Sequence, residues 1–316
     1  MGFPVTVVLG ASGRIGTLLR HCWPQLYSSP EIASALRWQS RRPLPPSLLP
    51  VTTAEHIALL DPLTDPKGLA ALISGADQVL CLAGAIPGRG GDLADNARLA
   101  CATVQAAARA AETSGRPAPR VLLSSSAAIY GNQPGVLAED CAPNPANAYG
   151  QAKLEMEQQA QALGAELGVP VTALRIGNIA GLDAILGGWQ PGFCLDQFAD
   201  GRSPRRSYIG PRSLAEILAR LLCTPDLPAA LNLAQPGLVE MADLLRAAAL
   251  PFDRCPAPAT AIAEVALDLQ LLMRILGQIP QADAAQMQAE WSMIEPVFAK
   301  KPAGPKDPIQ SKEPRS

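Results

Sequence analysis

Short apolar runs alternate with longer amphipathic stretches along the first half of the chain. Each apolar run is bounded by Gly, Pro, Asp or Ser, which is typical of a strand that is buried on both faces. The runs that predict strands lie at residues 5–9, 35–39, 57–60, 78–83, 121–125 and 171–175. The stretches between them predict helices at residues 15–27, 69–73, 92–112 and 149–167. This alternation predicts an α/β fold with a doubly wound parallel sheet, in which ligands bind beyond the carboxyl ends of the strands.

The second half of the chain is patterned less regularly. Residues 177–212 are rich in Gly, Pro and Asp and predict loops around a site, and helical patterns follow at residues 213–223, 239–250 and 259–276. We expect a larger domain over residues 1–175 and a smaller C-terminal lobe over residues 176–299 that binds the substrate. The remaining residues, 300–316, are rich in Pro and charged side chains and predict a disordered tail.

The segment VVLGASGRIG, residues 7–16, places three glycines where the first strand gives way to a helix. Gly10 suits the sharp turn after the strand, because it has no Cβ. Gly13 allows the backbone to approach a bound pyrophosphate, whose charge faces the first amides of the helix. Gly16 allows that helix to pack closely on the sheet. A glycine turn between a strand and a helix predicts a dinucleotide site, with a simple tight turn as the alternative.

The segment ALRWQSRRP, residues 35–43, bears on which dinucleotide binds. An acidic residue after the second strand would bind the ribose hydroxyl of NAD, but this segment contains no Asp or Glu. Ser40, Arg41 and Arg42 stand there instead, and guanidinium groups suit the oxygens of a 2′-phosphate. Arg14, within the glycine turn, is a further candidate for that contact. We therefore expect NADP in preference to NAD, with solvated surface arginines as the alternative interpretation.

Two further segments carry candidate catalytic side chains. In RVLLSSSAAIYG, residues 120–131, a buried strand ends in three serines, the last of which is Ser126. In YGQAK, Tyr149 and Lys153 stand four apart on a predicted helix and so share one face. A free tyrosine has a pKa of about 10, which a nearby ammonium lowers towards the pH at which the phenol works as an acid or base. The serine hydroxyl would orient a substrate carbonyl or alcohol.

The glycine turn, the serine strand and the Tyr-x-x-x-Lys helix, in this order, resemble the extended branch of the short-chain dehydrogenase/reductase family. This family includes NAD-dependent epimerases and dehydratases, and the resemblance implies a Rossmann fold. It also implies that Ser126, Tyr149 and Lys153 are catalytic, with Tyr149 as the acid or base and Lys153 as its activator. Further matches are LLDPLTD at 59–65, VLCLAG at 79–84 and LRIGNIAG at 174–181. The resemblance implies the following cofactor-binding residues: Gly10, Ser12, Gly13, Arg14, Ile15, Gly16, Ser40, Arg41, Arg42, Asp61, Leu82, Ala83, Gly84, Ser124, Tyr149, Lys153 and Ile176.

The same resemblance implies contacts with the substrate, made by Ser126, Asn178 and Arg206. Arg206 opens the segment RSYIGPRSLAEIL, in which the family's arginine often meets a substrate phosphate. The chain departs from the family here, because Ser213 stands where Asp is usual and Gly210 where His or Asn is frequent. The substrate is therefore specified less well than the cofactor.

Three functions remain open on these residues. We favour an NAD(P)-dependent oxidoreductase that transfers a hydride between the nicotinamide and a carbonyl or alcohol. The alternative is a nucleotide-sugar epimerase that retains NAD. A dehydratase is disfavoured, because Ala127 and Ala128 follow Ser126 where Asp-Glu would be typical. A hypothesis of another class, a non-catalytic dinucleotide sensor or assembly protein, is weakened by the presence of both Tyr149 and Lys153.

Composition constrains the partners and the compartment. The 316 residues carry 26 Lys and Arg against 28 Asp and Glu, a net charge of −2, so we expect a small-molecule substrate and neither nucleic acid nor a membrane as partner. Seven cysteines without a CxxC predict buried free thiols and a cytoplasmic setting, and with two histidines we expect no metal site. By the family resemblance, the helices at 92–112 and 149–167 would form the contact of a homodimer.

Overall fold

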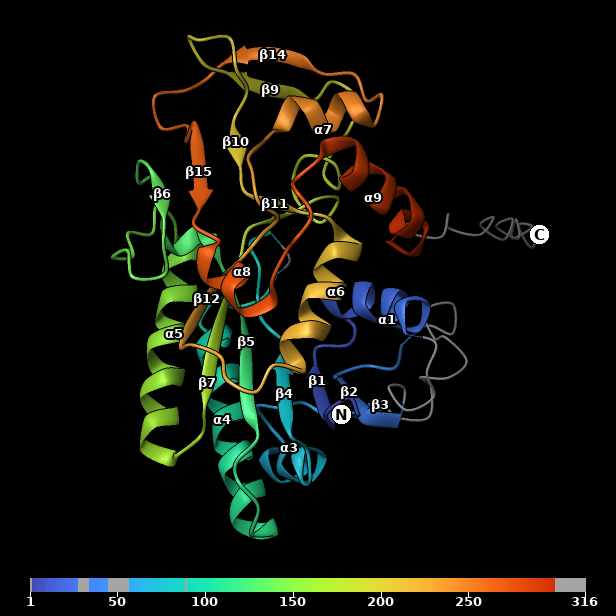
Figure 1. The fold of residues 1–316 in the computed structure, drawn as a ribbon, viewed down its shortest axis with the longest axis vertical. Coiled ribbons are helices and arrows are strands. Elements are labelled where there is room, and N and C mark those ends of the chain that lie inside the picture. Colours follow the sequence, from blue (N-terminus) through green and yellow to red (C-terminus); the bar gives the residue numbers. More distant parts are fainter. Residues whose placement is uncertain (1, 28–33, 45–56, 89, 299–316) are drawn as a thin grey trace, which may run out of the picture.

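The computed structural model describes residues 2–27, 34–44, 57–88 and 90–298, so the predicted tail at 300–316 lies outside the described residues. A seven-stranded sheet, whose paired strands all run parallel, forms the centre of the molecule (Figure 1). Its strands, in spatial order, are β12 (Ala230–Leu233), β7 (Val171–Ile176), β5 (Arg120–Ser126), β4 (Gln78–Cys81), β1 (Thr6–Leu9), β2 (Leu36–Ser40) and β3 (Ile57–Leu59). The order reverses between β1 and β4, which confirms the predicted doubly wound sheet and sets its switch point there.

Successive residues of the central strands enter two separate apolar cores, which explains why apolar residues stand at adjacent positions along these strands. Val8, Leu80 and Leu122 belong to one core, whereas their neighbours such as Val7 and Leu123 belong to the other. The helices that supply the two cores flank the sheet, with α3 (Pro66–Ile73), α4 (Asp95–Ser114) and α5 (Ala148–Leu167) on one side and α1 (Arg14–Leu26) and α6 (Pro211–Leu222) on the other.

The first turn of α5 is fixed by local sequence. The Asn147 side chain caps the helix by accepting a hydrogen bond from the Gly150 backbone N–H at 2.9 Å. A Cβ on Gly150 would lie 3.0 Å from the carbonyl carbon of Ala128, so glycine allows this turn to press against η3 (Ala127–Ile129), which follows β5. Tyr149 is thereby held next to the end of the serine strand.

The C-terminal lobe is built from short strands and three helices above the carboxyl edge of the sheet (Figure 1). A small sheet has the order β13 (Val239–Glu240), β10 (Arg205–Arg206), β15 (Glu264–Leu267) and β6 (Val136–Leu137). Two strand pairs accompany it, β8 (Asn178–Ile179) with β11 (Tyr208–Ile209) and β9 (Cys194–Gln197) with β14 (Asp253–Pro256). The helices are α7 (Met241–Ala247), α8 (Gln270–Leu276) and α9 (Ala284–Phe298). No helix in the described ranges is long and apolar enough to cross a membrane.

The second half of the chain differs from its predicted pattern at several points. The helix predicted over 259–276 is wrong in its first part, where β15 pairs with β10 and β6, and only α8 is helical. Residues 239–240 form β13 before α7 begins. β12 and α6 fall within the range predicted for the lobe but belong to the large sheet and its covering layer. Pairing between distant segments decided these elements, and local periodicity does not encode it.

The cysteines correct one expectation. Cys194 on β9 and Cys255 on β14 form a disulfide, with their Cα atoms 6.0 Å apart, so these two are not free thiols. Their segments are 61 residues apart, and the parallel pairing of β9 with β14 brings them together. Among the free cysteines, Cys22 and Cys81 are buried as expected, but Cys223 is exposed.

Candidate functional site

The glycine turn lies at the switch point of the sheet, between the carboxyl ends of β1 and β4. Gly10 has a φ of +90°, which a residue with a side chain rarely adopts, and a Cβ there would lie 2.8 Å from the backbone nitrogen of Ala83. A Cβ on Gly16 would lie 2.9 Å from the Cα of Ala11, so this position also needs glycine. The turn is closed by the Gly13 N–H, which donates to the Gly10 carbonyl at 2.9 Å.

The amino end of α1 is left open by its own sequence. Gly13 occupies the N-cap position, where it has no side chain to bind the first-turn amides, and the first turn contains no acidic residue. Arg14 and Ile15 begin the helix and Ser12 is exposed beside them. A helix start without a capping side chain or an acidic residue carries partial positive charge, which fits the pyrophosphate of a dinucleotide.

Gln39, which the sequence argument did not select, fixes the turn from the side of β2. Its side-chain oxygen accepts from the Gly10 N–H at 3.0 Å, and its amide nitrogen donates to the Leu60 carbonyl at 2.7 Å. Only 1% of Gln39 is exposed. The available signal was a polar residue within a buried strand, because such a group needs hydrogen-bonding partners.

The end of β2 presents two arginines and no carboxylate. The Ser40 hydroxyl is buried and donates to the Arg42 carbonyl at 2.7 Å, so it stabilises the turn that follows the strand. Arg41 and Arg42 are exposed on this turn. Across β3, Asp61 accepts from the Leu63 N–H at 3.0 Å and is only half-buried.

Tyr149 and Ser126 meet at the end of β5. The Ser126 hydroxyl and the positive charge of Arg14 both act on the phenol. Burial raises the pKa of Tyr149 above its ordinary value, while Ser126 and the Arg14 charge oppose this rise. The expected lowering by Lys153 is therefore not seen: burial outweighs the nearby charges, and the cation acting on the phenol is Arg14.

Lys153 is buried one turn along α5, with 4% of its surface exposed. Its Nζ donates to the Ser124 backbone carbonyl at 2.7 Å and lies 5.9 Å from the centre of the Tyr149 ring. Burial lowers the pKa of Lys153 to about 8, and the charges of Cys81 and Glu157 oppose this lowering. Lys153 is thus close to losing its proton under mildly alkaline conditions.

A buried acceptor lies beside Lys153. The Asn96 side-chain nitrogen donates to the carbonyls of Ala85 at 3.1 Å and Leu93 at 2.9 Å, but its oxygen has no hydrogen-bonding partner among the described residues. A Cβ on Gly84 would lie 2.5 Å from that oxygen and 3.6 Å from Lys153 Nζ, so the missing side chain leaves space between the two polar groups. An unpaired buried acceptor and this space fit a bound polar group such as a cofactor hydroxyl or water.

The remaining predicted cofactor residues line the same edge. Leu82 follows β4 and donates its N–H to the Leu9 carbonyl at 3.0 Å, which ties the end of β4 to the end of β1. Ile176 ends β7 opposite Ser126 in the register of β5 and β7. The fold therefore brings the glycine turn, the β4 end, the serine strand and the start of α5 to one edge of the sheet.

The substrate residues predicted in the lobe are engaged within the protein. Asn178 on β8 lies opposite Tyr208 on β11, and the Tyr208 hydroxyl donates to Asp183 at 2.8 Å. The Arg206 guanidinium donates to three backbone carbonyls, those of Arg205 at 2.7 Å, Ile262 at 2.7 Å and Ala263 at 3.3 Å. Burial lowers the pKa of Arg206. Arg206 therefore stabilises the small sheet of the lobe in this structure.

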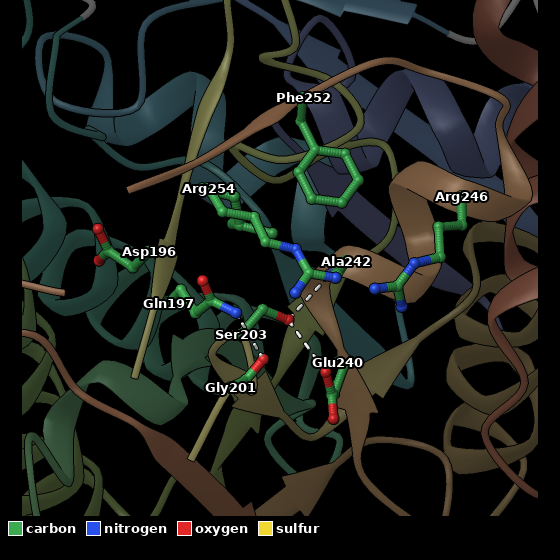
Figure 2. A pocket seen from close by; sticks show the side chains of 10 residues that line it. Asp196, Gln197, Gly201, Ser203, Glu240, Ala242, Arg246, Phe252 and Arg254 are labelled. Carbon is green, nitrogen blue, oxygen red and sulfur yellow. Dashed lines mark hydrogen bonds between the residues drawn. The ribbon is translucent and has the colours of Figure 1, made fainter. Parts of the chain in front are cut away.

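A second hollow, which the sequence argument missed, lies within the lobe (Figure 2). Arg246, Phe252 and Arg254 line this hollow together with Ser203 and Ala242. Ser203 Oγ accepts from the Ala242 N–H at 3.1 Å and donates to Glu240 at 3.3 Å. None of these residues belongs to a recognised motif, and the pairing of β9 with β14 and of β10 with β13 brings them together.

The match to a known protein family covers most of the large sheet but not most of the C-terminal lobe. The family described as "NAD dependent epimerase/dehydratase family" matches residues 6–185, which hold the glycine turn, the serine strand and the Tyr149 helix. The match ends before most of the C-terminal lobe. No curated protein matches the chain.

Solved structures are similar over almost the whole chain. MoeE5 in complex with UDP-glucuronic acid and NAD is 21% identical, with a TM-score of 0.68 over 92% of this chain and 99% of that one. The UDP-glucose-4-epimerase of Stenotrophomonas maltophila, with NAD and formylated UDP-arabinopyranose, is 20% identical, with a TM-score of 0.68 over 94% of this chain and 100% of that one. The dTDP-glucose 4,6-dehydratase DesIV of Streptomyces venezuelae, with NAD and TYD bound, is 17% identical, with a TM-score of 0.70 over 92% of this chain and 98% of that one. At these identities the likeness establishes the fold.

Proposed function

The chain belongs to the NAD dependent epimerase/dehydratase family, a family of enzymes, and on this premise we propose that it is an NADP-dependent oxidoreductase of a small carbonyl or alcohol compound. The observation that carries the proposal is the approach of Tyr149, at the start of α5, to Ser126 at the sheet edge that holds the glycine turn. A bound nicotinamide would supply or accept the hydride there.

Tyr149 is the proton donor for carbonyl reduction in this proposal. Because burial keeps its pKa above the ordinary value, the phenol carries its proton at neutral pH and can donate it to the developing alkoxide. Ser126 orients the carbonyl oxygen through its hydroxyl. Lys153, which is held by the Ser124 carbonyl beside Asn96, binds the ribose hydroxyls of the cofactor. In the oxidation of an alcohol the same proton moves back to Tyr149.

The preference for NADP rests on the end of β2. Arg41 and Arg42 are exposed there, and Ser40 stands where a carboxylate would repel a 2′-phosphate. Two exposed guanidinium groups would bind that phosphate by charge-assisted hydrogen bonds. The similar structures hold NAD, so this preference would set the chain apart from them.

A small, uncharged substrate is favoured by the state of Arg206. Its hydrogen bonds to Arg205, Ile262 and Ala263 occupy the donors that would otherwise meet a substrate phosphate. The second candidate is a nucleotide-sugar epimerase, which the family match and the UDP-linked ligands of two of the similar structures favour.

Titration with NADPH and with NADH tests the cofactor. We expect NADPH to bind at least about tenfold more tightly, and the Arg41→Ala/Arg42→Ala variant to lose most of that difference, because each charged contact with the phosphate is worth about 1.5–3 kcal/mol. Arg109→Ala, which removes an exposed arginine from α4, is the matched control. Tighter binding of NADH by the unaltered protein would overturn the NADP preference.

Turnover tests the reaction. A panel of carbonyl compounds and nucleotide sugars is screened for protection of the NADPH-loaded protein against heat, and each protecting compound is then assayed for NADPH oxidation. The Tyr149→Phe variant should bind NADPH normally and lose at least about a hundredfold in kcat, since it cannot donate the proton. Unchanged kcat in this variant would remove Tyr149 from the mechanism. Epimerisation of a UDP-sugar by protein that keeps NAD bound would establish the second candidate instead.

A further inference from the structure

Behind the candidate site lies a buried polar cluster that the roles described so far do not use. Its centre is Glu157 on α5, one helical turn beyond Lys153 and 2% exposed. Arg175, at the end of β7, forms an ion pair with it, with Nη2 at 2.9 Å and Nε at 3.2 Å from Oε2. The two side chains are 3% and 8% exposed. A buried carboxylate of this kind is retained only where its charge and its lone pairs are matched.

The other carboxylate oxygen of Glu157 reaches the serine strand. Glu157 Oε1 accepts a hydrogen bond from the Ser125 hydroxyl, and Ser125 lies directly opposite Arg175 in the register of β5 and β7. Ser125 stands between the two residues of the strand that act on the catalytic candidates. The Ser124 carbonyl accepts from Lys153, and the Ser126 hydroxyl acts on the phenol of Tyr149.

The ion pair is also anchored on the far side. Arg175 Nη1 donates to the Tyr130 hydroxyl at 2.9 Å and to the Glu139 carbonyl at 2.7 Å. The Tyr130 hydroxyl in turn donates to Asn232 on β12 at 2.8 Å. Because each nitrogen of the Arg175 guanidinium group donates a hydrogen bond, the Glu157 carboxylate has one fixed position between α5, β5 and β7.

We propose that Glu157 is a positioning residue of the catalytic site, which acts through Ser125 to hold the strand end at 124–126 in register with Tyr149 and Lys153 on α5. This inference rests on the proposed function, because it concerns the same catalytic groups. Two contributions can be separated. The hydrogen bond to Ser125 sets the geometry, and the negative charge of Glu157 favours the protonated form of Lys153.

The charge contribution depends on what surrounds Lys153. On α5 it faces Tyr149 and Glu157, and from β4 it faces Cys81. Burial raises the pKa of the Cys81 thiol. On α4 Lys153 faces the uncharged side chain of Asn96. The groups whose negative charge raises the pKa of Lys153 are therefore Cys81 and Glu157, and Glu157 is paired on its other side with Arg175.

The first test follows the titration of Lys153 and requires no substrate. Lysine is labelled with 13C at Cε, and the Lys153 signal is assigned by its loss in Lys153→Met. Glu157→Gln removes the charge and should move the Lys153 titration to lower pH by about one unit. Ser125→Ala should leave the titration in place. Glu155→Gln, an exposed carboxylate on the same helix, is the matched control and should also leave it in place.

Because Glu157→Gln leaves Arg175 buried without its carboxylate, this variant can fail to fold. The Glu157→Gln/Arg175→Met variant removes both charges together and serves as the second variant. It should show the same shift of Lys153 to lower pH. A Lys153 titration that stays at the unaltered pH in every folded variant lacking the Glu157 charge would overturn the electrostatic part of the proposal.

The second test measures kcat and KM with the substrate found in the heat-protection screen. Ser125→Ala should lower kcat at least about tenfold, with the KM for NADPH unchanged and the pH profile unmoved, because it disturbs only the alignment of the strand end. Unchanged kcat in a folded Ser125→Ala protein would overturn the positioning role. Failure of the proposed function would look different, since the unaltered protein would then show no turnover while the Lys153 titration could still respond to Glu157.

Discussion

Glu290, near the middle of the last helix, completes a helix that lies far from it in the sequence. Its carboxylate is 6% exposed and accepts from the N–H groups of Arg212 at 3.0 Å and Ser213 at 3.1 Å, and from the Ser213 hydroxyl at 2.9 Å. A carboxylate at the start of α6 satisfies amides that have no partner within the helix and opposes its dipole. Ser213 stands where the family usually has Asp, and Glu290 supplies a carboxylate at that helix start from elsewhere.

We predict that Glu290→Gln lowers the free energy of unfolding by about 1–2 kcal/mol, because the amide group keeps the shape but loses the charge at the helix start. Chemical denaturation monitored by circular dichroism measures the change. Glu295→Gln, which alters an exposed residue of the same helix, should change stability by less than about 0.5 kcal/mol. Equal effects of the two substitutions would show that the cap contributes nothing.

Lys153 should set the alkaline limit of activity. Its pKa of about 8 means that the ammonium is present below this pH and is lost as the pH rises through it. Tyr149 keeps its proton over the same range, because burial raises its pKa above the ordinary value. We therefore predict that kcat/KM for carbonyl reduction falls above pH 8. The Lys153→Arg variant stays charged, so its kcat/KM should not fall over this pH range, even if its activity is low. A fall above pH 8 that persists in Lys153→Arg would come from the titration of another group.

At the scale of the elements, β9 and β14 pair with each other and with no other strand of the described residues. These two strands form a separate two-stranded sheet at the end of the lobe, joined by the Cys194–Cys255 disulfide. The same strands supply Leu195, Gln197 and Arg254 to the hollow of Figure 2. A two-stranded sheet is marginal by itself, so the covalent link carries much of the order of this region.

We predict that Cys255→Ser lowers the free energy of unfolding of the region around β9 and β14 by about 2–4 kcal/mol, compared with the unaltered oxidised protein. The reason is that the disulfide closes a long loop. Thermal unfolding with and without a thiol reductant, together with hydrogen exchange across the two strands, measures this. Cys223→Ser, which removes an exposed free cysteine, is the control and should leave both measurements unchanged. Unfolding that does not respond to reductant would contradict the prediction.

At the scale of the whole molecule, one parallel sheet with a covering layer on each face carries the candidate cofactor residues, and the lobe lies over its carboxyl edge (Figure 1). On one side of the sheet, α4 and α5 lie next to each other. Ala102 of α4 is half-buried and Ala162 of α5 is exposed, so small side chains remain on the outer surface of these helices. A second copy would cover such a surface closely.

We expect a homodimer that forms through α4 and α5, and light scattering should give about twice the 33.0 kDa mass of one chain. Ala102→Arg/Ala162→Arg places two bulky charges on this surface and should yield the monomer. Ser292→Arg, at an exposed position of α9, should remain dimeric. A monomeric mass for the unaltered protein would exclude this assembly.

Much of the site was readable from local sequence because its parts are local. The glycine turn needs Gly10 and Gly16 for backbone reasons that the structure bears out, and the four-residue spacing of Tyr149 and Lys153 fixes their common helix face. Six of the seven strands of the large sheet were predicted from their apolar runs, whereas β12 was not. The absence of an acidic residue at the end of β2 was also evident from the sequence.

Tertiary structure decided what depends on pairing between distant segments. The sheet order that brings Tyr149 to the glycine turn, the Glu157–Arg175 ion pair behind Ser125, the cap by Glu290 and the Cys194–Cys255 bond all join residues that no local pattern relates. The pKa of Tyr149 also depended on the fold, because burial raises it and the cation that opposes this rise is Arg14 of the glycine turn. The sequence determined which chemical groups this protein has and which backbone turns it can make. Only the packed chain determined their neighbours and their exposure to water, and these set the pKa values and the partners of buried groups.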